Sequence, residues 1–125
     1  MAVFCSDERF VSASLEFLRQ ILKTDRFDLI ALPGAPAFIA QSERSLIERL
    51  KLLLGAQRIK RVVLIAHEDC GYYKNQYPGL PFDEIRQKQL DDLSKATEFL
   101  KDAGVDFCAF FAFVERNEIV FDRVR

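Results

Sequence analysis

The segment from Val62 to Ala66 limits the possible folds more than any other part of the chain, because it is apolar at every position. A strand in a parallel sheet is covered by helices on both faces and is therefore continuously hydrophobic. Its length also suits a strand better than a helix. The segment therefore predicts a central strand of a parallel sheet that lies between two layers of helices.

Strand and helix patterns alternate along the rest of the chain. Strands are expected at Ala2–Phe4, Phe27–Leu32, Val62–Ala66, Val105–Val114 and Ile119–Val124, and helices at about Val11–Lys23, from Ser42 as N-cap to Gly55, and at about Phe82–Ala103. A turn at residues 116–118 makes the last strand antiparallel. The order predicts an α/β fold with an open, mostly parallel sheet. Its first four strands are expected in the order 2-1-3-4.

Length and composition exclude several classes of protein. The 125 residues are enough for one domain, expected to span residues 1–125, and too few for two. With 18 basic and 19 acidic residues there is no electrostatic footprint for nucleic acid. No apolar run approaches a membrane span, and the N-terminus does not resemble a signal peptide. Three cysteines, an odd number, favour a cytoplasmic protein that keeps its thiols for metal.

Two short motifs carry residues of types that can bind zinc. Cys5 follows the first predicted strand, and His67 and Cys70 follow the third. Two thiolates and one imidazole make three protein ligands, which leaves the fourth tetrahedral position open, as in catalytic zinc sites. If these strands are neighbours, the motifs meet at the carboxyl edge of the sheet, where ligands of such sheets bind. A lone cysteine is usually only a buried apolar residue, and this interpretation is preferred for Cys108.

Asp7 lies two residues after Cys5 and can reach the same metal. Asp7 has two available roles. It either occupies the fourth position, or it is held away by a bidentate pair with Arg9 and orients a metal-bound water. A plain surface ion pair between Asp7 and Arg9 is the alternative without function.

The pattern Cys5-x-Asp7-x-Arg9 followed by His67-x-x-Cys70-Gly71 resembles the zinc-site signature of β-class carbonic anhydrases. The resemblance implies that Cys5, His67 and Cys70 hold Zn²⁺. It implies that Asp7 and Arg9 form the gating and orienting pair. It also implies a zinc-bound hydroxide that hydrates carbon dioxide to bicarbonate, and a homodimer or a multiple of dimers.

Two positions depart from the family pattern. Leu32-Pro33-Gly34-Ala35-Pro36 stands where the family usually has a stretch like Arg-Asn-Ala-Gly-Asn, and Tyr72 stands where it often has a second glycine. Gly34, Ala35, Gly71 and Tyr72 are candidates for the substrate pocket. Tyr72 and Tyr73 either line this pocket or pack at a dimer interface.

Two other functions remain open beside carbon dioxide hydration. The same site would also suit hydrolysis of carbon disulfide or carbonyl sulfide, because the loop after the second strand is apolar. A non-catalytic zinc-binding or anion-binding protein is the other alternative.

Overall fold

Five strands form one sheet in the order β2-β1-β3-β4-β5 in the computed structural model, which describes residues 1–125. The first four strands are parallel, and β5 pairs antiparallel with β4. The bounds of the strands are β1 Ala2–Phe4, β2 Leu29–Ala31, β3 Arg61–His67, β4 Asp106–Glu115 and β5 Glu118–Arg123. The predicted α/β fold and strand order are therefore confirmed.

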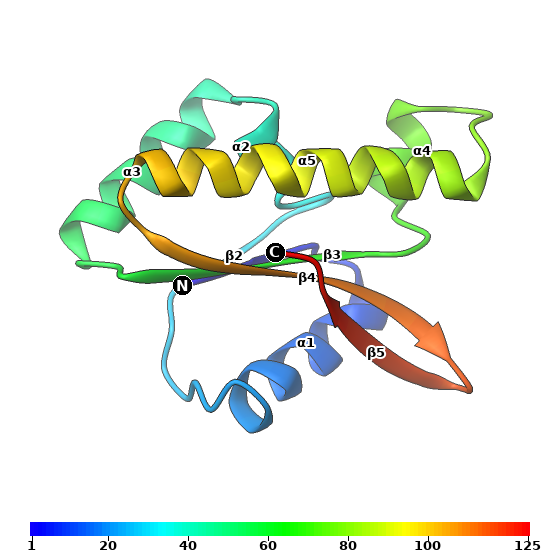
Figure 1. The fold of residues 1–125 in the computed structure, drawn as a ribbon, viewed down its shortest axis with the longest axis horizontal. Helices are drawn as coiled ribbons and strands as arrows, with labels where there is room; N and C mark the ends of the chain where they lie inside the picture. Colours follow the sequence, from blue (N-terminus) through cyan, green and yellow to red (C-terminus); the bar gives the residue numbers. More distant parts are fainter.

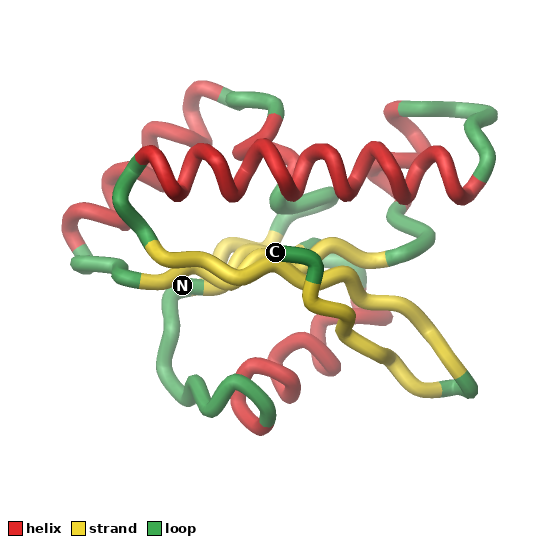
Figure 2. Tube along the Cα trace, in the orientation of Figure 1, coloured by secondary structure: helices red, strands yellow, loops and turns green.

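Helices cover both faces of this sheet (Figure 1). Their bounds are α1 Glu8–Gln20, α2 Ala37–Ala40, α3 Arg44–Ala56, α4 Gly71–Gln76 and α5 Phe82–Asp102. Helix α1 lies alone on one face, and the long α5 lies with the other three helices on the opposite face (Figure 2). Side chains of β3 alternate between the two faces, since Val62 and Leu64 pack on the α5 side and Val63 and Ile65 on the α1 side.

The register of the central strands brings the two motifs to the same edge. Phe4 of β1 pairs with Ile65 of β3, so that Cys5 lies level with the last residues of β3. His67 is the last residue of β3 and pairs with Ala112 of β4. The carboxyl ends of β1 and β3 therefore lie next to each other, as the strand order predicted.

Several local predictions differ from the structure. Helix α1 begins at Glu8, three residues before Val11, because the Asp7 side chain accepts a hydrogen bond from the Arg9 backbone and caps it. Ser42 is not the N-cap of α3; it has a φ of 53°, and Glu43 is the N-cap. Gly55 lies inside α3 rather than ending it.

The short helices α2 and α4 lie in segments that showed no helical pattern. Ala37, Phe38 and Ile39 of α2 are buried, and so is Tyr73 of α4. Helices of four and six residues are too short to show a period, so burial against the rest of the fold stabilises them.

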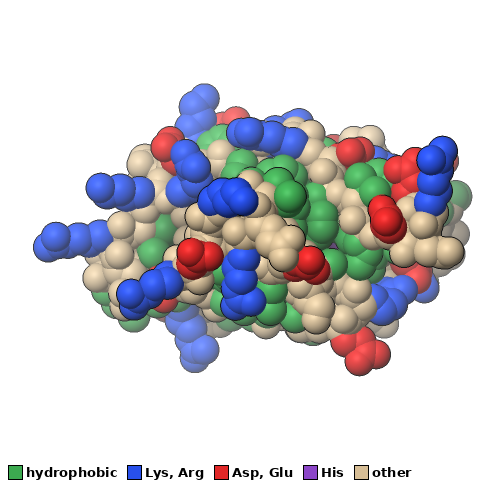
Figure 3. All heavy atoms as spheres, turned by 90° about the horizontal axis from the view of Figure 1, so that it is seen from below, with side chains coloured by type: hydrophobic (Ala, Val, Ile, Leu, Met, Phe, Trp, Pro, Cys, Tyr) green, Lys and Arg blue, Asp and Glu red, His purple; other side chains and the backbone are tan.

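The α1 side of the molecule keeps some hydrophobic surface. Figure 3 shows this surface between charged side chains, with Lys and Arg gathered toward one end. On this side of the sheet, a groove between α1 and β5 is lined by residues that include Ile21, Ile119 and Phe121. None of the helices combines the length and the apolar character that a membrane crossing requires.

Candidate metal centre

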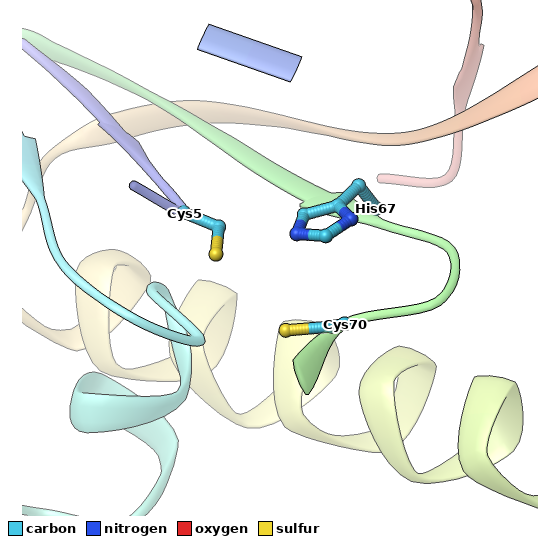
Figure 4. A group of neighbouring side chains, drawn as sticks. All are labelled: Cys5, His67 and Cys70. Atoms are coloured by element: carbon cyan, nitrogen blue, oxygen red, sulfur yellow. The ribbon is translucent and has the colours of Figure 1, made fainter. Parts of the chain in front are cut away.

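Cys5, His67 and Cys70 come together at the carboxyl edge of the sheet. Cys5 directly follows β1, His67 ends β3, and Cys70 is the N-cap residue of α4. Their ligand atoms all lie within 4.8 Å of one another, and all three residues are buried. Figure 4 shows the two sulfur atoms and the imidazole ring directed toward a common space. The cluster has the composition of a three-ligand zinc site.

Contacts around His67 determine which ring nitrogen faces the cysteines. Its Nδ1 lies 2.6 Å from the Glu68 carbonyl oxygen, which can only accept, so Nδ1 carries the proton and donates it. Phe10 stacks on the ring at a centroid distance of 4.3 Å, and Gln89 donates to the His67 carbonyl at 2.8 Å. Nε2 is left buried with a free lone pair and no hydrogen-bond partner. A buried polar atom without a partner lowers the stability of the fold. Coordination of a metal by Nε2 would give this atom a partner.

The two cysteines are electrostatically different. Pairing with the neighbouring Cys70 thiol lowers the pKa of Cys5, although burial acts in the opposite direction. The same pairing and burial raise the pKa of Cys70. The Gly34 backbone N–H also donates to Cys5 Sγ, at 3.4 Å. A divalent cation among these sulfurs would favour two thiolates, because a coordinating thiol is deprotonated.

Asp7 lies beside the cluster but is paired with Arg9. Arg9 Nη2 donates to Asp7 Oδ2 at 2.6 Å and Nε donates to Oδ1 at 3.0 Å. These bonds hold the pKa of Asp7 at about 2, well below its usual value. The same Oδ2 lies 4.0 Å from His67 Nε2. The carboxylate is therefore ionised, fixed by Arg9 and close to the cluster.

Asp69, which the sequence interpretation did not select, also binds Arg9. Its Oδ2 accepts from Arg9 Nη1 at 2.9 Å, and its carbonyl oxygen accepts from Nη2 at 2.9 Å. Lys74 donates to the other carboxylate oxygen at 2.8 Å. Arg9 therefore bridges the segment after Cys5 and the segment between His67 and Cys70.

The four candidate pocket residues lie in different surroundings. The Gly34 backbone contacts Cys5, and the Tyr72 ring packs against Gly34. Ala35 is buried in the core on the α5 side, whereas Gly71 is exposed at the start of α4. Tyr73 is buried, and its hydroxyl donates to Asp92 at 2.6 Å.

Gln89 and Phe10 are further site residues that the sequence interpretation missed. The sequence does carry a signal for Gln89, because this residue lies between Ile85 and Leu93 on the apolar face of α5. A polar side chain on a buried face requires a hydrogen-bond partner. Phe10 carried no comparable signal, since a buried aromatic residue on α1 is ordinary core.

Comparison with known proteins identifies one protein family and two relatives of this chain. A protein-family model described as "Putative carbonic anhydrase" matches residues 1–122. An uncharacterized protein of Rickettsia bellii (strain RML369-C) is 23% identical over 103 residues, which cover 78% of this chain and 58% of that protein. An uncharacterized protein of Rickettsia conorii (strain ATCC VR-613 / Malish 7) is 26% identical over 102 residues, which cover 78% of this chain and 50% of that protein. The chain spans about half the length of the curated relatives that it matches.

Two solved structures share the fold. The crystal structure of the β-carbonic anhydrase CafA of Aspergillus fumigatus matches with a TM-score of 0.53 and 14% identity, over 97% of this chain and 73% of that chain. The structure of the β-carbonic anhydrase CcaA matches with a TM-score of 0.53 and 16% identity, over 98% and 75% of the two chains. At these identities the likeness concerns the fold.

Proposed function

The chain belongs to the "Putative carbonic anhydrase" family, and from that membership we propose that it is a zinc enzyme that hydrates carbon dioxide to bicarbonate and a proton. The observation that carries the proposal is the buried cluster of Cys5, His67 and Cys70, with an ionised Asp7 beside it. The chemistry that bound zinc supplies in a three-ligand site is acidification of a water at the open position.

The residues of the chain have separate roles in this proposal. Cys5, Cys70 and His67 Nε2 hold the metal, and the Glu68 carbonyl accepts from Nδ1, which makes Nε2 the metal-binding nitrogen of the neutral ring. Asp7 Oδ2 accepts a hydrogen bond from the attacking water and orients it. Arg9 keeps this carboxylate charged and in place through its bidentate pair.

Stopped-flow hydration of carbon dioxide at pH 8.5, on protein with measured zinc content, tests the proposal. We expect a zinc-dependent rate that falls to the uncatalysed background in Cys70→Ser, because the site then loses a thiolate ligand. Cys108→Ala is the matched control, since Cys108 is a buried free thiol that lies in the core rather than in the cluster. This control is expected to keep the rate.

One zinc per chain without hydration would contradict the proposed activity and leave the two alternatives. Sulfide release from carbon disulfide or carbonyl sulfide would then identify the hydrolase, and tight zinc binding without any turnover would identify a binding protein. The homodimer, the cytoplasmic location and the assignment of residues 1–125 to one zinc-binding domain stay predictions.

A further inference from the structure

The Tyr72 ring and the Gly34 backbone are in direct contact beside Cys5. A Cβ atom added to Gly34 would lie 2.2 Å from Tyr72 Cδ1 and 2.4 Å from Tyr72 Cγ. Gly34 also has a φ of 71°, which disfavours any residue with a side chain. Only glycine therefore allows the ring to lie this close to the backbone.

The other contact of Gly34 is with a residue of the metal cluster. Its N–H donates to Cys5 Sγ at 3.4 Å, in a buried environment. The peptide of Gly34 is therefore held between the Tyr72 ring and the Cys5 sulfur. A displacement of this segment would remove a hydrogen bond from the sulfur.

Tyr72 is itself fixed by a second contact. Its hydroxyl donates to Gln41 Oε1 at 2.7 Å, and Gln41 Nε2 donates to Gln76 Oε1 at 3.1 Å. Gln41 is the C-cap residue of α2, and Gln76 is the last residue of α4. Tyr72 therefore joins α4, which begins directly after Cys70, to the segment that contacts Cys5.

We propose that Tyr72 is a positioning residue of the metal centre: its ring packs on Gly34 and thereby holds the Gly34 N–H on the Cys5 sulfur. This inference rests on the proposed zinc site. It assigns to Tyr72 an effect on metal affinity and on the electronic state of the Cys5 sulfur, since residues that hydrogen-bond or orient a ligand tune the metal.

Metal affinity and cobalt spectra test the inference without measuring activity. Zinc affinity is measured by competition with a chelator, and cobalt(II)-substituted protein reports the thiolate-to-metal charge-transfer band. We expect Tyr72→Ala to weaken zinc binding by about 10- to 100-fold and to shift the band. Tyr72→Phe keeps the ring and is expected to retain the band and most of the affinity. Tyr72→Leu provides the same test as Tyr72→Ala if the alanine variant does not fold.

Gly34→Ala tests the contact from the other side. We expect weaker zinc binding, because the new methyl group meets the ring. Gly104→Ala is the matched control, since Gly104 has a φ of 74° and open space around its position, so that it adds the backbone strain without the clash. In the double variant Gly34→Ala/Tyr72→Ala the clash is relieved. Its loss of zinc affinity should therefore be at least about fivefold smaller than the product of the two single losses.

Unchanged zinc affinity and an unchanged band in Tyr72→Ala would overturn the inference. A double variant whose loss of zinc affinity equals the product of the two single losses would overturn it as well. Wild-type protein that binds no zinc would overturn the proposed function and this inference together. Wild-type protein that binds zinc but hydrates no carbon dioxide would contradict the activity alone, because the metal-affinity test reads the site directly.

Discussion

A single carboxylate, that of Asp7, begins helix α1 and also pairs with the Arg9 guanidinium. Its Oδ1 accepts from the Arg9 backbone N–H at 3.0 Å, which is an N-cap bond, and both oxygens accept from the Arg9 side chain. The helix end therefore fixes the position of the carboxylate that lies beside His67. In the proposed mechanism the same carboxylate also orients the attacking water. An amide at this position would still cap the helix but would lack the negative charge.

Substitution of Asp7 separates the two roles. Asp7→Ala removes the cap and is expected to lower the free energy of unfolding by about 1 kcal/mol, whereas Asp7→Asn keeps a good cap. Both variants lose the charged acceptor, so that carbon dioxide hydration should fall by about 100-fold in each. Urea denaturation and stopped-flow rates of both variants provide the test. A fully active Asp7→Asn would contradict the orienting role.

Helix α5 supports the site as an element rather than through a ligand. Two polar residues on its buried face, Gln89 and Asp92, bind the His67 carbonyl and the Tyr73 hydroxyl. These contacts hold the end of β3 and the start of α4, which are the segments that carry His67 and Cys70. Each of these buried polar groups has a hydrogen-bond partner, as stable packing requires.

Gln89→Leu is expected to lower the free energy of unfolding by about 1–3 kcal/mol, because the buried His67 carbonyl loses its donor. Gln87→Leu is the matched control on the same helix, since Gln87 is exposed and bonds only Asp91 in the next turn, at 2.9 Å. Its loss should stay within about 0.5 kcal/mol. Urea denaturation measures both, and equal losses would contradict the supporting role of Gln89.

At the scale of the whole molecule, the cluster of Cys5, His67 and Cys70 joins parts of the chain that are far apart in sequence. Cys5 lies near the N-terminus, and His67 and Cys70 lie at the end of the central strand and the start of α4. A metal that binds only the folded chain stabilises it by mass action. The proposed site should therefore contribute to the stability of the whole fold.

Removal of the metal tests this contribution. With free zinc about 1,000-fold above its Kd, the free energy of unfolding should rise by about 4 kcal/mol relative to metal-free protein. Thermal unfolding with zinc and with a chelator measures the difference. Cys108→Ala should respond to zinc like the wild type, and Cys5→Ser should lose most of the response. A wild-type Tm that zinc and the chelator leave unchanged would contradict a structural contribution of the site.

The sequence by itself determined the order of the strands and the meeting of the two motifs that carry Cys5, His67 and Cys70. Continuous apolarity identified β3, and parallel strands with adjacent carboxyl ends bring Cys5 close to His67 and Cys70 without any special loop. These features follow from local patterns and from the geometry of parallel sheets, which a sequence displays directly.

Only the tertiary structure decided the surroundings of the cluster. The Phe10 stack, the Gln89 bond to His67 and the contact between Tyr72 and Gly34 all join segments far apart in the chain. The short helices α2 and α4 likewise depend on burial, because four and six residues carry too little periodicity to predict a helix. Such contacts depend on the packing of whole elements, and no local pattern in the sequence encodes that packing.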